Sequence, residues 1–405
     1  MPARLRLRCG WRTSRQYALR APLRAASGAS GAISLSGGNV QDARGLTFEC
    51  QPGCGFCCTA TPLVLPHEAG PLGPLVVRAE DGTLRIPMTG PACGALRADR
   101  ACGVYEVRPS VCHLYPYQVH AGRRIQATVS LGCPGIAEAH ALHPAQAHPF
   151  GVDKRAEDGA TRAIALALAQ PGAQEQAARA KQTFVEFDRR MKEWGVHATS
   201  DKLRSAFVPR LESFARPELL PALFAGLSEG DLLLDDPGAV AALFETEPQA
   251  DLEDLLVEGA ADAFDEPDTV IWVEADHAWT QARAEAGEVV LTRTPGGERR
   301  LAVDALPTAW TDEARDALAA YLARLCGRDQ TEGAAAWLVD ASGYQATLPA
   351  AYARVLGEAS LQVALRAGLL AAEEGAPEIT LALARRGVAA YETSYHSLPT
   401  LGAIL

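Results

Sequence analysis

The chain of 405 residues has few lysines, no long apolar run and none of the common motifs of nucleotide-binding or hydrolytic enzymes. Lysine accounts for only four of its 38 basic residues, and the formal net charge is −11. That acidic balance argues against general nucleic-acid binding, which needs a basic face. No apolar run approaches the roughly 20 residues that cross a bilayer. A phosphate-binding glycine loop, an HExxH zinc motif and a nucleophile elbow are all missing, so these enzyme classes lack their usual signatures here.

The first forty residues contain no acid and no apolar secretory core. Seven arginines lie between Arg4 and Arg24, and a stretch rich in serine, glycine and alanine follows from Ala25 to Gly38. This composition resembles an organelle transit peptide. We favour a disordered basic arm, or sequence translated from an early start codon with the true start near Val40. Residues 1–41 are therefore expected to lie outside the folded domains, and the remainder, without those seven charges, carries −18.

Cysteine is concentrated in one segment of the chain. Eight of the ten cysteines fall within 84 positions, whereas Cys9 and Cys326 are isolated. Disulfides, a structural zinc ion or an iron–sulfur cluster could each cause such clustering. Disulfides are disfavoured, because no secretory signal is evident and two adjacent cysteines bridge poorly. The eight predicted metal ligands are Cys50, Cys54, Cys57, Cys58, Cys93, Cys102, Cys112 and Cys133.

The opening spacing, C-x3-C-x2-C-C, lets one turn of backbone bring two thiolates to one metal, while distant cysteines complete a tetrahedron. Adjacent side chains usually point apart, so Cys57 and Cys58 are expected to serve two sites, or to give one ligand and one further thiol. Eight thiols thus fit two four-thiolate sites, or one cluster with extra thiols. Zinc and an iron–sulfur cluster both fit the pattern, and the surplus of thiols favours the cluster.

The polar neighbours of the cysteines have predicted roles of their own. Pro109 is expected to begin a helical turn whose free N–H groups favour a thiolate at Cys112. Arg108 could hydrogen-bond bound sulfide, an anionic substrate or a loop carbonyl. His113 and His120 could replace a thiolate as ligands, but we interpret them as ordinary polar residues, since thiolates already suffice. Four polar residues without a unifying spacing are interpreted as surface: Asp340, Tyr344, Glu392 and His396.

The opening motif, the segment CGVYEVRPSVCHLYP over Cys102–Pro116 and the later Cys133-Pro-Gly together resemble the YkgJ-type cysteine-cluster family. The resemblance covers about Cys50 to Gly135 and implies a zinc- or iron-chelating domain. That family has arginine directly after the cysteine of its Arg-Pro-x-x-Cys element, where this chain has His113, so a role for that arginine does not transfer. Some flagellin lysine N-methylases carry a similar motif, which makes methyl transfer an alternative. The first three cysteines also match radical-SAM spacing, but five further cysteines have no place in that scheme.

Helix and strand patterns occupy separate blocks beyond the cysteines. Apolar residues at helical spacing predict a helix over Ala173–Trp194, with Phe184, Phe187 and Met191 on its buried face. Strand patterns over 269–304, with a turn at Pro295-Gly296-Gly297, predict an antiparallel meander. A strand is expected over Arg124–Leu131. Further helices are predicted at 203–214, 217–227, 311–326 (with Thr311 as N-cap), 333–338, 348–371 and 378–391.

These patterns predict an α+β protein with three folded regions. A small, loop-rich, metal-stapled cysteine domain spans 42–137, a helical acidic region spans 138–268, and a β-meander with a helical C-terminal region spans 269–405. The predicted function is a redox or metal-handling module that holds an iron–sulfur cluster or Zn2+. A cluster-dependent methyltransferase and a zinc-stapled scaffold are the alternatives, and no catalytic residue is predicted. We expect a cytoplasmic protein with a protein or small-molecule partner, and neither nucleic acid nor a membrane as partner.

Overall fold

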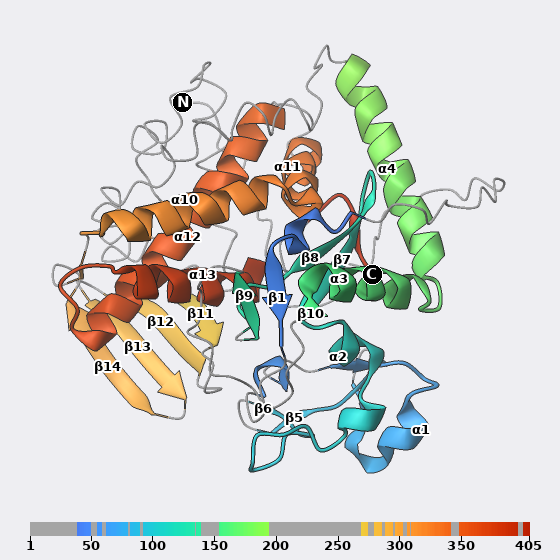
Figure 1. Cartoon of the computed structure of the whole chain (residues 1–405), viewed down its shortest axis with the longest axis horizontal. Coiled ribbons are helices and arrows are strands. Elements are labelled where there is room, and N and C mark those ends of the chain that lie inside the picture. Colours follow the sequence, from blue (N-terminus) through green and yellow to red (C-terminus); the bar gives the residue numbers. More distant parts are fainter. Residues whose placement is uncertain are drawn as a thin grey trace, which may run out of the picture.

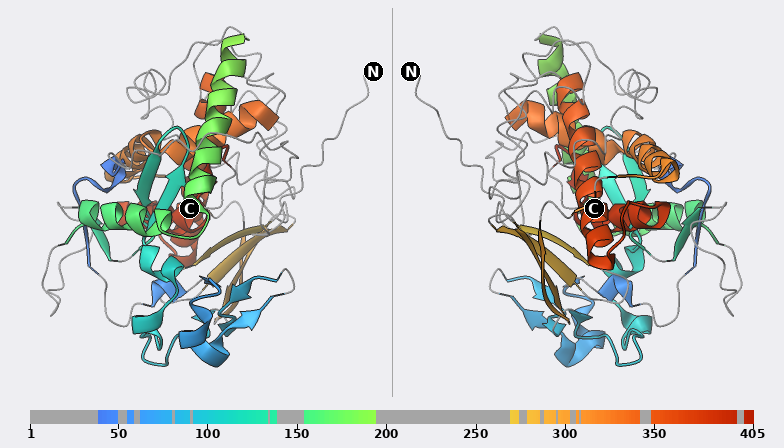
Figure 2. Two further views of the ribbon diagram at one scale, coloured as in Figure 1. Left: turned by 90° about the vertical axis from the view of Figure 1, so that its right-hand side faces the viewer. Right: turned by 90° about the vertical axis from the view of Figure 1, so that its left-hand side faces the viewer.

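The computed structural model places the cysteine region at one end of the molecule (Figures 1 and 2). The long helices lie away from that end (Figure 1). The helices predicted between 203 and 227, and the acidic stretch that follows them, fall outside the residues that the structure describes. The described residues are 39–49, 55–58, 62–79, 82–89, 92–133, 135–138, 154–193, 269–273, 279–285, 288–294, 296–302, 306–307, 309–341, 348–395 and 400–405.

The cysteine region is built from very short strands and single helical turns, because proline and glycine interrupt each apolar stretch. Strands β2, β4 and β3 form one antiparallel sheet in that order, and β5 and β6 form a hairpin. The helical turn expected to begin at Pro109 is confirmed, and Pro109 separates it from a preceding 3-10 turn. The elements are η2 (Phe56–Cys58), β2 (Leu63–Val64), α1 (Ala69–Leu72), η3 (Gly73–Leu75), β3 (Val77–Arg78), β4 (Leu84–Arg85), β5 (Met88–Thr89), β6 (Ala92–Cys93), η4 (Tyr105–Val107) and α2 (Ser110–Leu114).

Two further small sheets follow the cysteine turns. The predicted strand at 124–131 is confirmed as β8, which pairs with β7, and the late strand β15 completes a sheet of order β15-β7-β8. Strand β1 lies between β9 and β10, antiparallel to both. Strands β7 and β15, which are far apart in the sequence, therefore share one sheet. The elements are η1 (Gln41–Ala43), β1 (Leu46–Phe48), β7 (Tyr117–Ala121), β8 (Ile125–Val129), β9 (Ile136–Glu138), β10 (Lys154–Arg155) and β15 (Ala403–Ile404).

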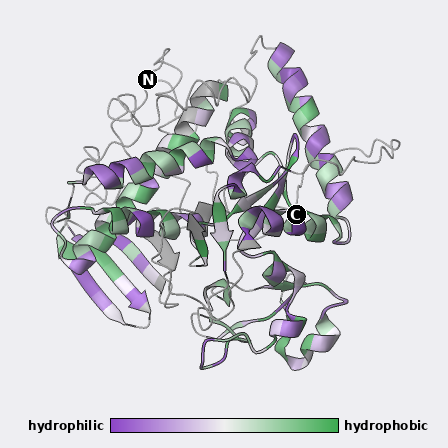
Figure 3. Cartoon of the chain, in the orientation of Figure 1, coloured by the Kyte–Doolittle hydropathy of each residue, from purple (hydrophilic) through white to green (hydrophobic). Residues whose placement is uncertain are grey.

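Two helices, α3 (Ala156–Leu168) and α4 (Ala173–Glu193), follow these sheets. Helix α3 packs on the β7–β8 hairpin at Gly159, where an added Cβ would lie 2.1 Å from the Tyr117 hydroxyl, so the close contact requires glycine. Helix α4 is amphipathic, and Figure 3 shows hydrophilic and hydrophobic residues interleaved along it. Its predicted apolar stripe is confirmed, since Phe184, Phe187 and Met191 are all buried.

The predicted meander is also confirmed. Its four strands pair antiparallel in sequence order, and Gly296 lies in the turn between the last two. Ala282, Val289 and Leu291 face the main hydrophobic core, which they share with α4 and the C-terminal helices. The strands are β11 (Thr269–Val273), β12 (Trp279–Glu285), β13 (Glu288–Thr294) and β14 (Gly297–Ala302).

Four helices supply most of that main core. The predicted N-cap is confirmed, because the Thr311 hydroxyl accepts a hydrogen bond from the Ala314 N–H at 3.3 Å. Strands and loops at the N-terminal end, followed by a mostly helical region with small antiparallel sheets, confirm the predicted α+β class. The helices are α10 (Asp312–Cys326), α11 (Asp329–Ala341), α12 (Leu348–Glu374) and α13 (Leu381–Tyr395).

Helix α12 contains a stretch, Val355–Glu374, that is long and apolar enough to cross a membrane by length and composition. Sequence inspection found no such run, because Glu358 and Arg366 interrupt it. In the structure 94% of this stretch is buried against the rest of the protein, as the central helix of a globular core would be.

Candidate metal centre

The adjacent Cys57 and Cys58 lie on the 3-10 turn η2. Gly55 begins this turn with φ of +59°, a conformation that glycine adopts without strain, and its carbonyl accepts a hydrogen bond from the Cys58 N–H at 2.8 Å. The two thiols are themselves hydrogen-bonded to each other. Cys58 is nevertheless buried and Cys57 exposed, so whether the two thiols serve one site or two stays a prediction.

Cys93 reaches the same place from the β5–β6 hairpin, where it pairs with Met88. Its thiol is hydrogen-bonded to that of Cys58. The chain turns sharply after it: the Gly94 N–H donates to the Pro87 carbonyl at 2.8 Å, and an added Cβ on Gly94 would lie only 2.9 Å from that oxygen. The glycine beside this cysteine thus permits the turn that the hairpin needs.

Cys102 and Cys112 border this thiol group. Cys102 forms an isolated bridge with Leu96, and Cys112 lies on α2, with its N–H donating to the Pro109 carbonyl at 2.9 Å. Glu68 fixes the start of α2, because its carboxylate accepts hydrogen bonds from both the N–H and the hydroxyl of Ser110. Both thiols carry an electrostatic interaction with the group, Cys102 with Cys58, and Cys112 with Cys57 and Cys93.

The central thiol, Cys58, donates toward its two neighbours and so favours their ionised forms. Its hydrogen bond lowers the pKa of Cys57 to about 7, with help from the positive charge of Arg108. The same kind of bond lowers the pKa of Cys93 to about 6. The pKa of Cys58 itself is raised, because its proton is shared with both neighbours. A metal ion that binds all three sulfurs would therefore displace the Cys58 proton.

Cys112 behaves differently from the sequence prediction. Desolvation, and next the charges of Cys57, Cys93 and Cys102, raise its pKa to about 12. Without a bound metal ion, the free N–H groups at the start of α2 therefore do not lower the pKa of this thiol. Burial among other sulfurs outweighs the N–H groups of a five-residue helix.

Arg108 is held in place by an aromatic ring and a histidine. Its guanidinium lies 4.3 Å from the centroid of the Tyr105 ring, and its Nε donates to His113 Nδ1 at 3.2 Å. Arg108 was expected to hydrogen-bond sulfide, an anionic substrate or a loop carbonyl. In the structure its Nε bonds to His113. Burial, and then the charge of Arg108, lower the pKa of His113, so the imidazole stays neutral beside the thiols.

The remaining predicted ligands fall into two groups. Cys133 is buried in another apolar cluster, with Tyr117, Val129 and Ile136. Cys50 and Cys54 lie outside the described residues. Among the residues that are described, no three His, Cys, Asp or Glu side chains already meet at the spacing of a metal site. An ion at the five thiols would therefore require them to converge further, or to add the predicted ligands Cys50 and Cys54.

Burial decides several other sequence predictions. His120 is fully buried on β7, where its Nε2 lies 3.0 Å from the Thr400 hydroxyl, and it is not beside the thiols. Cys326 is a buried thiol at the end of α10. Glu392 was interpreted as surface, and this is wrong because it is fully buried on α13. Asp340 is exposed as expected, whereas Tyr344 and His396 lie outside the described residues.

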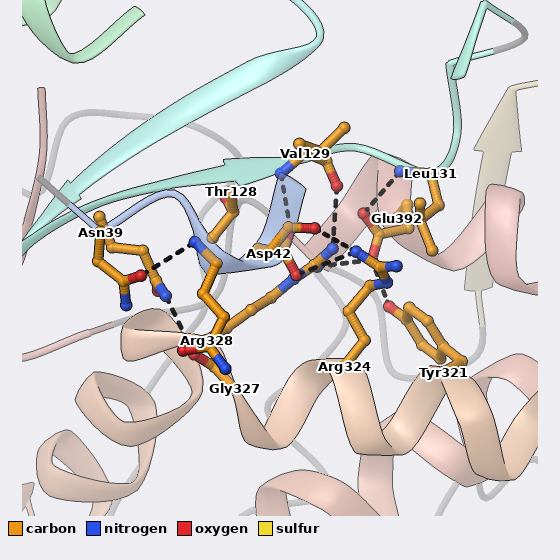
Figure 4. Close-up of polar contacts among 12 residues, drawn as sticks. Asn39, Asp42, Thr128, Val129, Leu131, Tyr321, Arg324, Gly327, Arg328 and Glu392 are labelled. Carbon is orange, nitrogen blue, oxygen red and sulfur yellow. Dashed lines mark hydrogen bonds and ion pairs between the residues drawn. The ribbon is translucent and has the colours of Figure 1, made fainter. Parts of the chain in front are cut away.

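Glu392 belongs to a buried ion network that sequence reasoning missed (Figure 4). The guanidinium of Arg328 lies between two carboxylates, 3.2 Å from Asp42 and 2.7 Å from Glu392, and the Tyr321 hydroxyl donates to Glu392 at 2.5 Å. Arg324 also pairs with Asp42, at 3.6 Å. No sequence signal could have found the network, because Asp42 and Arg328, which bond directly, are 286 positions apart.

This network holds the segment that leads to Cys133. Asp42 accepts the Val129 N–H at 2.8 Å, Arg328 donates to the Val129 carbonyl at 2.9 Å, and Glu392 accepts the Leu131 N–H at 3.2 Å. The end of β8 is thereby fixed to α13 and to the turn between α10 and α11, and the cysteine region is attached to the helical core by buried charges.

A family model matches the chain over the cysteine segment. Residues 49–134 match the family model CxxCxxCC, described as "Putative zinc- or iron-chelating domain". The match covers about a fifth of the chain and includes all eight clustered cysteines. No curated protein and no solved structure matches the chain. The expected cofactor, an iron–sulfur cluster or Zn2+, agrees with this description of the chelating domain.

The donor chemistry of the chelating domain fits such a metal. Its gathered side chains are thiols, which are the soft ligands that zinc and iron–sulfur clusters take, and they carry no disulfide in the structure. Two of them have lowered pKa values and so offer thiolates near neutral pH. The Arg108 guanidinium partly offsets the negative charge that accumulates on the sulfurs.

Proposed function

We propose that this protein is a metal-handling or redox module whose chelating domain holds zinc or an iron–sulfur cluster through Cys57, Cys58 and Cys93. Cys102 and Cys112 are the nearest further ligands, together with the predicted Cys50 and Cys54. The observation that carries the proposal is the pair of hydrogen bonds through which the Cys58 thiol joins Cys57 to Cys93. When bound, zinc would fix the loops, and an iron–sulfur cluster would add one-electron chemistry.

The finer parts of the proposal follow from the same thiols. Reduced cysteines persist in the cytoplasm, which is where we place the protein. The YkgJ-type resemblance supports a chelating role, and the helical region is the surface for a protein or small-molecule partner. Anaerobic purification with metal analysis and a visible spectrum tests the identity of the metal. Iron with sulfide and a brown colour indicates the cluster, colourless protein with zinc indicates the structural ion, and protein free of both refutes the proposal.

Replacing Cys93 should remove the metal. In Cys93→Ser the buried sulfur that Cys58 contacts is lost, and we expect the metal content to fall to about a tenth or less of the wild-type content, because serine is a poor ligand for these metals. Cys326→Ser is the matched control, since it removes another buried thiol far from the group, and it should keep its metal. Equal metal content in Cys93→Ser and wild type would contradict the assignment. Cys133→Ala, measured in parallel, shows whether that separate thiol also contributes.

Metal removal should loosen the cysteine region and spare the helical core. The region has only a small apolar cluster of its own, whereas α10–α13 pack around the main core. We expect chelation to raise amide hydrogen exchange over 55–112 by at least about tenfold, because metal binding and local folding are coupled in such small domains. Exchange in α10, α12 and α13 should not change. Unchanged protection over 55–112 after complete metal loss would count against a folding role for the metal.

A further inference from the structure

The five gathered thiols differ sharply in their access to solvent. Cys58 and Cys93 are 7% and 5% exposed, and both pack in the apolar cluster that includes Val64, Leu72 and Ile86. Cys102 and Cys112 are half-buried. Cys57 alone among these five is exposed. The thiol group therefore has a closed side, made by two buried sulfurs, and an open side at Cys57.

Access matters because bound metal ions move between proteins by ligand exchange. An entering thiolate must reach the metal before a resident sulfur leaves, so exchange begins at the ligand that solvent reaches. The apolar packing around Cys58 and Cys93 keeps an entering ligand away from their bonds to the metal. At Cys57 no such cover exists among the described residues.

A fixed positive charge stands beside the open side. Arg108 interacts electrostatically with Cys57, and the guanidinium is held by the Tyr105 ring and His113. It can stabilise a Cys57 thiolate that has left the metal, so that the leaving sulfur needs no proton. The same charge attracts an anionic thiolate that approaches from solvent.

On the basis of the proposed function, we infer that the metal enters and leaves through Cys57, which exchanges with the thiolate of a donor or acceptor molecule while Cys58 and Cys93 retain the ion. In the exchange the bond between the metal and Cys57 breaks, and a bond to the entering sulfur forms. Cys57 keeps the electron pair as a thiolate, the entering thiol releases its proton to water, and no electron is transferred. The substrate class is a metal ion carried by a thiol compound or by a cysteine-bearing protein.

Alkylation of the zinc-loaded full chain tests the inference directly. The chain is loaded with zinc, its content is checked by metal analysis, and it is then treated with limiting iodoacetamide and mapped by mass spectrometry. Among the five gathered thiols we expect the first label on Cys57, at a rate at least about tenfold above that of Cys58 and Cys93, because accessible thiolates react first. First labelling at Cys58, Cys93, Cys102 or Cys112 would overturn the inference. A chain that takes up no zinc fails the earlier metal analysis, and it refutes the proposed function together with this inference.

A pair of variants adds a second measurement. Release of zinc to the chelator 4-(2-pyridylazo)resorcinol is followed as glutathione is increased, in wild type, Cys57→Ser and the control Cys326→Ser. Wild type and Cys326→Ser should release zinc faster with more glutathione, by at least about tenfold over the range, because each entering thiolate speeds exchange. Cys57→Ser should release zinc at a rate that glutathione does not change. The same glutathione dependence in Cys57→Ser as in wild type would overturn the inference, even where the variant holds zinc more weakly.

Discussion

Arg328→Met should lower the free energy of unfolding by about 3–5 kcal/mol, because removing one partner of a buried ion pair leaves uncompensated charge in the interior. The Arg328 side chain has no exposed surface, and the Glu392 carboxylate that it contacts at 2.7 Å has none either. Urea unfolding of both proteins, followed by circular dichroism, measures the difference. We expect the loss to appear as a lower midpoint with the same slope.

The control for this prediction is the same substitution at an exposed arginine. Arg300 pairs with Glu288 and Glu298 on the meander, with about half of each side chain exposed. Arg300→Met should cost no more than about 1 kcal/mol, because solvent screens such pairs. The double variant Arg328→Met with Glu392→Leu should recover part of the loss, since it removes the orphaned carboxylate. Equal effects of Arg328→Met and Arg300→Met would show that the buried network contributes little to stability.

His120 should make the protein less stable as the solution is acidified below the pKa of a free histidine. Burial lowers the pKa of His120 to about 4, although the nearby carboxylate of Asp329 acts in the opposite direction. An unfolded chain takes up this proton near pH 6.5, whereas the folded chain excludes it until about pH 4. The free energy of unfolding therefore falls as the pH drops from 6.5 to 4, by about 3 kcal/mol from this residue, and is flat below.

A variant without the imidazole isolates this contribution. The difference in unfolding free energy between wild type and His120→Gln should shrink by about 3 kcal/mol from pH 7 to pH 4. Wild type alone loses the His120 contribution, while the carboxylates of both proteins titrate alike. Urea unfolding at pH 7, 5.5 and 4 measures it. His67→Gln, at an exposed histidine, should track wild type at all three values. Parallel pH profiles for wild type and His120→Gln would contradict the prediction.

The sequence predicted those elements whose signals are local. Thr311 caps its own helix through a bond three residues away, and the meander is set by alternating strands and a Pro-Gly-Gly turn. The apolar stripe of α4 follows directly from helical periodicity. In each of these cases the residues that decide the structure are near neighbours in the chain, so inspection of one window suffices.

Elements that depend on distant partners were missed. Strand β7 contains Gln118 and His120, and a polar residue such as His120 is buried there only because Thr400 contacts it from 280 positions away. Arg328 and Glu392 are a second example. In the sequence both look like surface residues, and their burial follows only once Asp42 is placed beside them. No spacing rule connects such positions.

The candidate site was predicted in its chemistry and only partly in its geometry. The clustering of thiols identified the chelating domain, but the order of burial among Cys57, Cys58 and Cys93 depends on the turn at Gly55 and on the apolar cluster around Ile86. The separate position of Cys133 depends on β8 and its buried charges. The spacing of the cysteines carries no information about the order of burial or about the position of Cys133. Whether Cys133 is a ligand therefore stays a prediction.

The pairing of β15 with β7 has a consequence for the order of events during synthesis. Residues 403–404 leave the ribosome long after β7, so the edge of β7 that will receive them stays open while some 280 further residues are made. The sheet beside the cysteine region can close only after residues 403–404 have been made. The Leu405 N–H donates to the Val119 carbonyl, so an insertion beside Leu405 would disturb this late pairing.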